Sequence, residues 1–222
     1  MDALDRLAEP GLDLLDRVDT LLAAGAPEGH PIWPLLRRMQ ALPGDAVRAF
    51  LDLHPAPLAE AGHAVRALVG AYDEVSRALA DPVAWSGAAA SAYDGSRAAL
   101  LRHLDEGPDS LVGRLESTAG YADALADWVE GSRLALARAL ADVLRSAEAV
   151  RVRVATAPGG EPRGPVLVAA ADVAHRVLSV LGVAYDGAET LLRQWSPSLT
   201  ESVWRAPAGG PSRYDVVTRV GR

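Results

Sequence analysis

The sequence contains no cysteine, no lysine and no asparagine, and it has a single phenylalanine. Without cysteine there can be no disulfide, no thiolate metal site and no thiol nucleophile. Aromatic residues make up only 5% of the chain, although 50% of its 222 residues are hydrophobic. Alanine, leucine and valine must therefore supply most of the buried surface, which favours closely packed helices over β-sheets. The composition predicts an all-α protein.

Clusters of like charge are also missing. The 22 positive charges are all arginine, and with 29 acidic residues they give a net charge of −7 that is spread along the chain. No block of arginine stands alone, which argues against a surface that follows the phosphates of DNA or RNA. We therefore expect no nucleic-acid partner. Arginine in place of lysine is typical of a GC-rich genome and indicates an actinobacterial source.

Long uninterrupted hydrophobic runs are absent too. The first six residues lack the basic and then apolar order of a secretory signal. The most apolar stretch, residues 165–184, contains Asp172, His175 and Arg176. The sequence therefore predicts no cleaved signal peptide and no membrane span, so that the protein is cytoplasmic before any export.

Proline and glycine divide the first 56 residues into short segments. Helical patterns cover residues 12–24, 31–42 and 45–53, and each is followed by residues that stop a helix. We expect residues 1–56 to form short helices that pack on a larger body.

Four longer helical patterns follow. The first runs from Pro57 to about Asp81, the second covers residues 89–104, the third continues to Val152 with a kink near one of its glycines, and the fourth runs over residues 165–195. The first has an apolar stripe at three- and four-residue spacing, formed by Leu58, Ala61, Val65, Leu68, Tyr72, Val75 and Leu79.

The turn between the second and third helices, residues 107–110, is short. Helices joined by so short a turn are expected to lie antiparallel. The sequence therefore predicts an antiparallel up-down four-helix bundle of long helices over residues 57–195, with a helical hairpin at 57–105. The remainder, residues 196–222, is rich in proline, glycine and serine and is expected to be a flexible tail.

The strongest local motif lies between the first two long helices. Trp85-Ser86-Gly87 stands at the break and is followed by two alanines and the aromatic Tyr93. A large ring at a bend can cover the end of a bundle or enter a partner, and glycine permits a tight turn. These residues resemble the Trp-X-Gly (WXG-type) helical hairpin family, the small substrates and partners of type VII (ESX-type) secretion systems. The resemblance covers residues 58–104, and this chain would be a longer relative of that family.

The resemblance implies a non-enzymatic protein-interaction module. The chain would be a type VII secretion substrate, or the partner or chaperone of one, and would leave the cell without a cleaved signal peptide. Its partner would be a small WXG-type protein or a second copy, giving a dimer, and the secretion ATPase is a further expected partner. The family resemblance assigns Trp85, Gly87 and Tyr93 to the hairpin motif.

The same systems read a Tyr-X-X-X-Asp/Glu signal, and the chain has one match, Tyr185 to Glu189. On a helix these two side chains lie one above the other and form one surface patch. Tyr185 and Glu189 are therefore the candidate export signal. The alternative interpretation is an amphipathic tyrosine beside a solvated glutamate.

Two other functions are compatible with the residues. A cytosolic helical adaptor or dimerisation scaffold unrelated to secretion would need the same apolar stripes. A di-metal oxidase would use Glu60-X-X-His63 and Asp172-X-X-His175, which have the i, i+3 spacing of di-iron bundles. Both histidines precede a stripe position by two residues, which turns their rings away from the predicted core. We therefore expect no metal, no cofactor and no catalysis.

Overall fold

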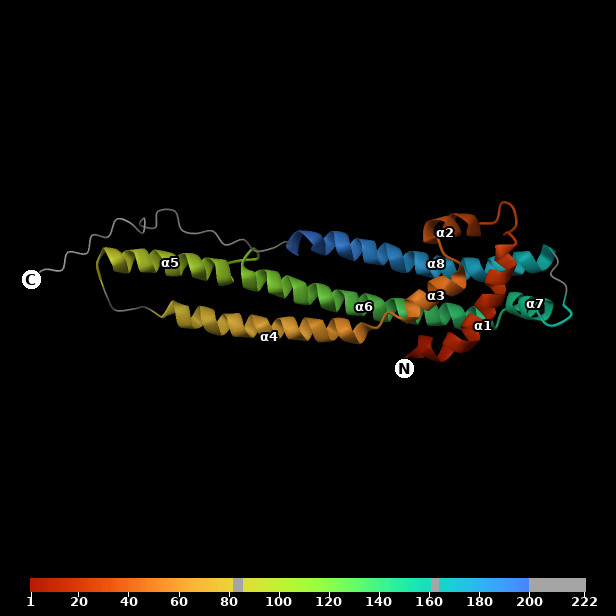
Figure 1. The fold of residues 1–222 in the computed structure, drawn as a ribbon, viewed down its shortest axis with the longest axis horizontal. Coiled ribbons are helices and arrows are strands. Elements are labelled where there is room, and N and C mark those ends of the chain that lie inside the picture. The colour runs from red at the N-terminus through yellow and green to blue at the C-terminus, as the bar shows by residue number, and fades with distance from the viewer. Residues whose placement is uncertain (82–85, 161–163, 200–222) are drawn as a thin grey trace, which may run out of the picture. The chain divides into compact units, whose positions relative to one another are not determined.

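The computed structural model describes residues 1–81, 86–160 and 164–199, and within these ranges the chain is helical with no strand (Figure 1). The predicted all-α class is therefore confirmed. In chain order, the helices are α1 (Ala3–Ala23), α2 (Ile32–Met39), α3 (Pro43–Leu51), α4 (Pro55–Ala80), α5 (Ala88–Asp105), α6 (Leu111–Leu144), α7 (Ala147–Ala155) and α8 (Gly164–Trp195), followed by the 3-10 helix η1 (Ser196–Ser198).

The first helix begins much earlier than the apolar pattern predicts. The Asp2 side chain accepts hydrogen bonds from the backbone N–H groups of Leu4 and Asp5, and the Asp5 side chain accepts from the Asp2 N–H. This reciprocal capping box satisfies the free donors of the first turn. α1 therefore starts at Ala3 and includes Pro10.

The third predicted helix ends earlier than expected. α6 passes both of its central glycines and ends at Leu144, and α7 begins after Ser146. The Ser146 hydroxyl accepts a hydrogen bond from the Ala149 N–H at 3.2 Å and serves as the N-cap of α7. A new N-cap favours a helix start over continuation of the previous helix. The prediction of one helix to Val152 was wrong for this reason.

Residue contacts divide the chain into two compact units. Unit 1 comprises residues 1–58 and 124–192, and unit 2 comprises residues 59–123 and 193–222. α6 contributes residues 111–123 to unit 2 and residues 124–144 to unit 1.

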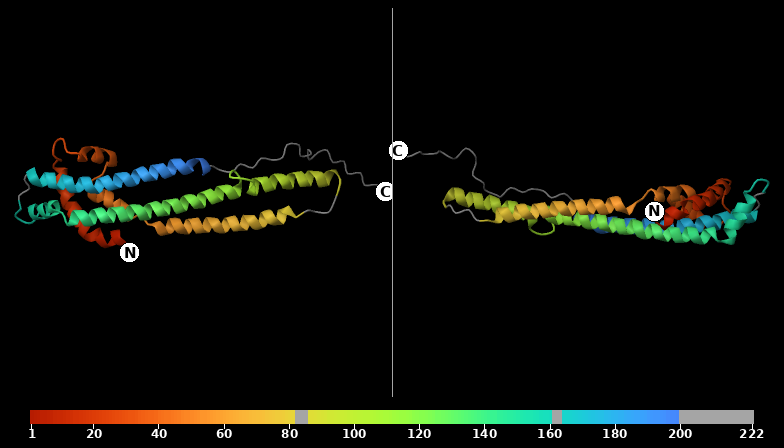
Figure 2. Two further views of the ribbon diagram at one scale, coloured as in Figure 1. Left: turned by 180° about the vertical axis from the view of Figure 1, so that it is seen from behind. Right: turned by 90° about the horizontal axis from the view of Figure 1, so that it is seen from below.

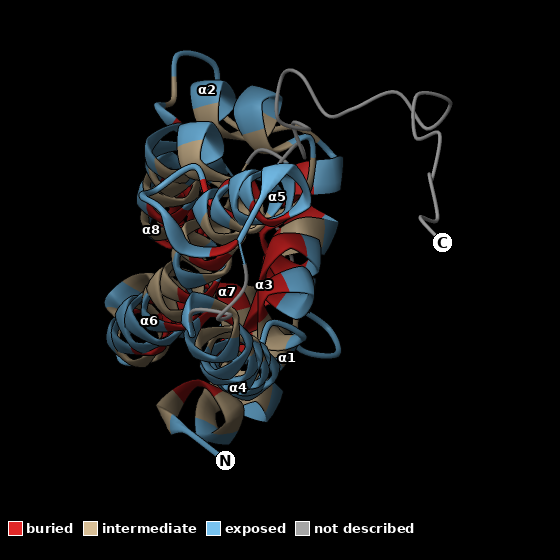
Figure 3. Cartoon of the chain, turned by 90° about the vertical axis from the view of Figure 1, so that its left-hand side faces the viewer, coloured by how far each residue is buried: buried red, intermediate tan, exposed pale blue. Residues whose placement is uncertain are grey.

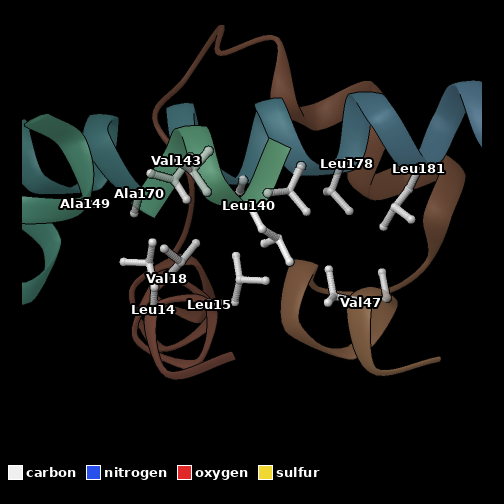
Figure 4. Packing of buried hydrophobic residues seen from close by; sticks show 14 of the residues in the cluster. Leu14, Leu15, Val18, Val47, Leu140, Val143, Ala149, Ala170, Leu178 and Leu181 are labelled. Atoms are coloured by element: carbon white, nitrogen blue, oxygen red, sulfur yellow. The ribbon is translucent and has the colours of Figure 1, made fainter. Parts of the chain in front are cut away.

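Unit 1 contains the large apolar core (Figure 4). The helices α1, α2 and α3 contribute side chains to this core. Leu14, Ile32 and Phe50, one from each helix, are each at most 1% exposed. α8 adds ten buried residues, most of them alanine, valine and leucine. Burying each leucine or phenylalanine side chain contributes about 2–3 kcal/mol. The short early segments are therefore an integral part of this core.

In unit 2, α4 lies antiparallel to both α5 and the first part of α6. Residues 73–80 of α4 and 98–106 of α5 line a common cleft, whereas Gly62 and Arg66 of α4 meet Asp123 of α6. The C-terminal part of α4 therefore lies beside the end of α5, and the N-terminal part of α4 lies beside the first part of α6. Both views of the ribbon show α6 continuing in the direction of α5 (Figures 1 and 2).

The predicted up-down order is therefore wrong at the turn between α5 and α6. The segment before α6 lies directly against its first turn, where Gly113 has no side chain. A Cβ on Gly113 would lie 2.6 Å from the Gly107 carbonyl oxygen and 2.8 Å from the Pro108 Cα. Gly107 itself has φ +87°, a conformation that glycine adopts without strain. The short turn thus displaces the helix axis without reversing the chain.

One helical stretch, Gly164–Ser198, is long and apolar enough to cross a membrane, and half of its most apolar window is buried within the structure. The core helix of a water-soluble protein satisfies the same criterion. This observation leaves the expected absence of a membrane span as a prediction.

Candidate interaction surface

The apolar stripe of α4 does not face the rest of unit 2. α4 buries only Gly62 and Ser76, and most of its surface is exposed or half-exposed (Figure 3). The side that meets α5 and α6 contains these two residues with Arg66, Asp73 and Ala80. Each lies one position after a residue of the predicted stripe, and one residue corresponds to a rotation of about 100° around a helix. Small and polar residues of α4 therefore face α5 and α6, and the predicted apolar stripe lies on a neighbouring side of the helix.

The exposed side of α4 forms a continuous apolar strip, which we call the α4 seam. Leu68 is 52% exposed and Val75 is 49% exposed. The seam has three- and four-residue spacing, extends for about 25 Å at 1.5 Å per residue, contains no charged residue, and consists of Ala61, Ala64, Leu68, Ala71, Val75 and Ala78, all exposed. Contiguous exposed apolar surface of this kind is typical of protein-binding surfaces.

The two edges of the seam differ. Val65, Tyr72 and Leu79 border one edge and are half-buried. Glu60 and Glu74 border the other edge and are exposed. An apolar centre with a charged rim is the usual organisation of a protein interface.

Gly87 and Tyr93 of the hairpin motif belong to the same unit as the α4 seam. Trp85 lies outside the described residues, so its position is not assigned. Gly87 precedes α5 with φ +114°, which side chains of L-residues rarely allow, and Tyr93 on α5 is 43% exposed. The structure thus has two separate antiparallel helices on either side of the motif.

Arg97 of α5 holds the end of α4 in place, a role that the sequence patterns did not indicate. Its guanidinium donates to the carbonyl oxygens of Leu79, Ala80 and Asp81 at 3.2, 3.2 and 2.8 Å. The last carbonyls of a helix have no partner within the helix, and arginine can satisfy them. The contact joins α5 to the C-terminal end of α4.

The candidate export signal lies on α8 in unit 1. Tyr185 is 40% exposed, and its ring contacts Phe50 edge-on with the ring centres 6.4 Å apart. Arg38 of α2 forms an ion pair with Asp186, inside the Tyr-X-X-X-Glu segment. The hydrogen bond to Asp186, together with the charge of Glu189, raises the pKa of Arg38. The segment is therefore joined to α2 by an exposed ion pair, and Tyr185 and Glu189 themselves remain exposed.

A groove of about 560 Å³ follows α6 and α8 in unit 1. The indole of Trp128 closes one wall and donates from Nε1 to the Ala184 carbonyl oxygen at 2.9 Å. Gly131 and Val183 also line the groove, and Val183 is 72% exposed. The groove is open and mostly apolar.

Arg133 of α6 is a buried charge that the sequence patterns did not identify. It is only 2% exposed, and it pairs with Asp2 at 2.6 Å and with Asp5 at 2.5 Å. The same guanidinium donates to carbonyl oxygens at the end of α3, those of Phe50, Leu51 and Leu53. Its hydrogen bond lowers the pKa of Asp2 to about 2. This network joins three helices and is structural, because it leaves no open position for a substrate.

Asp19 of α1 caps α3 from a distance. Its side chain accepts a hydrogen bond from the Gly44 N–H at 3.0 Å, while the N-cap position of α3, Leu42, has no side-chain cap of its own. Burial raises the pKa of the Asp19 carboxyl to about 6, although the Gly44 hydrogen bond acts in the opposite direction. Asp19 therefore serves the packing of α1 on α3.

The histidines considered for a di-metal site have other contacts. His63 is exposed, and its Nδ1 lies 2.7 Å from the Ala59 carbonyl oxygen. Asp172 accepts a hydrogen bond from Nε2 of His30 at 3.2 Å, since Nδ1 of His30 accepts from the Ile32 N–H, and the ring of His175 contacts the His30 ring edge-on with the ring centres 6.3 Å apart. Among residues 1–81, 86–160 and 164–199, no group of three or more metal-binding side chains is placed to hold a metal ion.

Comparisons of the chain with models of protein families, with curated proteins and with solved structures returned no match.

Proposed function

We propose that this protein is a non-enzymatic protein-interaction module that binds a helix of another chain through the α4 seam. The observation that carries the proposal is the exposure of Leu68 and Val75 on a strip without charge. Covering the exposed half of each side chain would contribute about 1 kcal/mol. The adjacent alanines would let a partner helix approach closely, so that dispersion contacts add to this term.

We further propose that the interaction serves type VII secretion, with the chain as a substrate or as the partner or chaperone of one. Trp85-Ser86-Gly87 at the break between α4 and α5 supports this assignment, as does the antiparallel arrangement of these two helices. Tyr185 and Glu189 are the proposed export signal, and both are exposed on α8. The protein would be cytoplasmic before export and would be secreted without a cleaved signal.

A secretion assay tests this function in a host that carries the system. Culture medium and cell pellet would be compared for the wild type, Trp85→Ala and Tyr185→Ala. The wild type is expected in the medium, and both variants are expected in the pellet, because each loses an aromatic recognition group. If the wild type stays in the cell while a known substrate leaves it, the secretion role is wrong.

The interaction itself has a separate test. Leu68→Glu places a charge in the α4 seam, whereas Val150→Glu places one on α7, where Val150 is 56% exposed and lies outside the seam. Leu68→Glu is expected to lose a co-purifying small helical partner at unchanged helix content, while Val150→Glu retains it. If Leu68→Glu loses the partner but the wild type is not secreted, the protein is a cytosolic adaptor or dimerisation scaffold.

A further inference from the structure

We propose that the cleft between α4 and α5 binds a small zwitterionic ligand, of the size of a dipeptide with a free ammonium and a free carboxylate end. The cleft has a volume of about 760 Å³, and all of its lining residues belong to unit 2. This volume falls within the range of small-molecule sites. The site is separate from the α4 seam, because other residues of α4 line it.

Charged residues follow the same order on both walls of the cleft. With increasing distance from the C-terminal end of α4, that helix presents Arg77 and then Asp73. Because α5 runs antiparallel to α4, it presents Arg102 and then Asp105 in the same direction. Two arginines therefore line the middle of the cleft, and two aspartates line its far end.

The register of the two helices brings the aspartates to one level. Arg97 of α5 donates to the carbonyl oxygens at the C-terminal end of α4, so the neighbouring Ala98 lies near the level of Ala80. Asp73 and Asp105 are each seven residues away from these alanines, which is about 10 Å along each helix. A cleft closed by its own ion pairs would instead place an arginine opposite each aspartate.

Most of these charges are left without a counter-charge from the chain. Among the described residues, Asp73, Arg77 and Asp105 form no ion pair, although Asp73 and Arg77 are four residues apart on one helix. Arg102 has only Glu106, at 4.0 Å. Like charges at one level repel each other. A ligand with an ammonium near the aspartates and an anionic group near the arginines would relieve both repulsions.

The hydroxyl of Ser76 supplies a second, independent indication of a ligand. Ser76 lines the cleft and is only 7% exposed, and its Oγ has no hydrogen-bond partner among the described residues. A buried hydroxyl without a partner costs free energy, which a ligand that bonds to it would recover. Ser76 lies between Asp73 and Arg77 in the sequence, so it would meet the middle of a ligand that joins the two charges.

The spacing of the charges sets the length of the ligand. Aspartate and arginine are four residues apart on α4 and three apart on α5, which is about 4.5–6 Å along the helices. A dipeptide spans about 6–7 Å, and its amide can bond to the Ser76 hydroxyl. The planar guanidinium groups suit a carboxylate, which they can bind through two parallel hydrogen bonds. A single amino acid is too short to reach both pairs of charges.

Titration of the isotope-labelled full chain with L-alanyl-L-alanine, followed by nuclear magnetic resonance, tests the proposal. The amide resonances of residues 73–80 and 98–106 are expected to shift saturably. Acetylation of the ammonium or amidation of the carboxylate should each weaken binding about tenfold, because each removes a charge-assisted contact. Free alanine is expected to give no saturable shift. Equal binding of the blocked dipeptides, or no saturable shift with L-alanyl-L-alanine, would overturn the proposal.

Variants of the cleft complete the test. Asp73→Asn and Arg77→Gln should each weaken binding about tenfold at unchanged helix content, and Ser76→Ala about fivefold. Glu74→Gln is the matched control, because Glu74 is exposed beside Asp73 but lies outside the cleft. It should bind as the wild type does. An equal loss with Glu74→Gln would show that only the overall charge matters and would overturn the site.

The cleft and the α4 seam can be separated in the same experiment. Leu68→Glu is expected to bind the dipeptide as the wild type does, because Leu68 belongs to the seam and does not line the cleft. Loss of dipeptide binding in Leu68→Glu at unchanged helix content would contradict a site confined to the cleft.

Discussion

At the scale of single residues, the buried Arg133 and the half-buried Asp19 show how far the packing departs from a purely apolar core. Arg133 sits on the inner side of α6 between Val129 and Leu136, both fully or nearly buried. A buried charge is tolerated only when it is paired and its donors are satisfied. Asp2, Asp5 and three carbonyl oxygens satisfy it. Removing the guanidinium would therefore leave buried acceptors as well as a cavity.

Asp19 gives a prediction on pH dependence. Burial raises the pKa of its carboxyl from 3.8 to about 6, so the folded state holds the proton more tightly than the unfolded state. The contribution of Asp19 to stability is therefore fully present below about pH 4 and is lost as the pH rises through about 6. Asp19→Asn keeps an acceptor for Gly44 and removes the charge. The variant should be more stable than the wild type at pH 7, by up to about 3 kcal/mol.

Urea denaturation of the wild type and Asp19→Asn at pH 4, 5, 6 and 7 measures this difference. The two free energies of unfolding should diverge above pH 4. Asp2 acts in the opposite direction. Its pKa is lowered to about 2, so its contribution to stability is present above about pH 4 and is lost only as the pH falls towards 2. Asp127→Asn, an exposed change on α6, is the control. Curves that stay parallel over the whole range would contradict the role assigned to Asp19.

At the scale of elements, glycine determines the direction that the chain takes between α5 and α6. Gly113 allows the preceding turn to lie on the first turn of α6. Gly95 of α5 has open space around its Cα, with nothing within 4 Å of an added Cβ. The two glycines therefore differ in what a methyl group would meet.

Gly113→Ala should destabilise unit 2, by about 1–3 kcal/mol, because the added methyl would overlap backbone atoms that cannot rotate away. Gly95→Ala should stabilise α5 by about 0.5–1 kcal/mol, since alanine has the higher helix propensity. Thermal unfolding followed by circular dichroism compares the two variants. Equal shifts of the melting temperature in one direction would show that the close approach at Gly113 does not exist in solution.

At the scale of the whole molecule, the two units differ in the quality of their cores. All of the largest fully buried side chains in the described residues belong to unit 1, among them Phe50, Leu140 and Leu178. Most buried residues of unit 2 are glycine, alanine or serine, such as Gly62, Ala99 and Ala119, and the larger ones are Leu104 and Val112. Unit 2 therefore has little apolar burial of its own, and a partner on the α4 seam would supply more.

Amide hydrogen exchange tests this difference. Amides of α8 and of α6 beyond residue 124 should be strongly protected, and those of α4 and α5 should exchange faster, because local opening exposes little additional apolar surface. Exchange of α4 should slow when a partner helix covers the α4 seam. Protection of α4 equal to that of α8 at low concentration would contradict the difference between the two units.

The sequence by itself determined the all-α class and the approximate limits of most helices. Helix formation depends on local hydrogen bonds and on capping residues, so spacing, proline and glycine were enough to separate α4 from α5 and to outline α8. The early start of α1 and the break before α7 depended on caps at Asp2 and Ser146, which are visible in the sequence but are weaker signals than the apolar pattern.

The tertiary structure alone decided which faces are buried and which way the helices run. The stripe of α4 predicted an inward face, yet the inward face is the neighbouring row with Gly62 and Ser76. The partners of Arg133, and the cap that Asp19 provides for α3, join residues far apart in the sequence. Such contacts depend on the packing free energy summed over several helices, and no local pattern contains that sum.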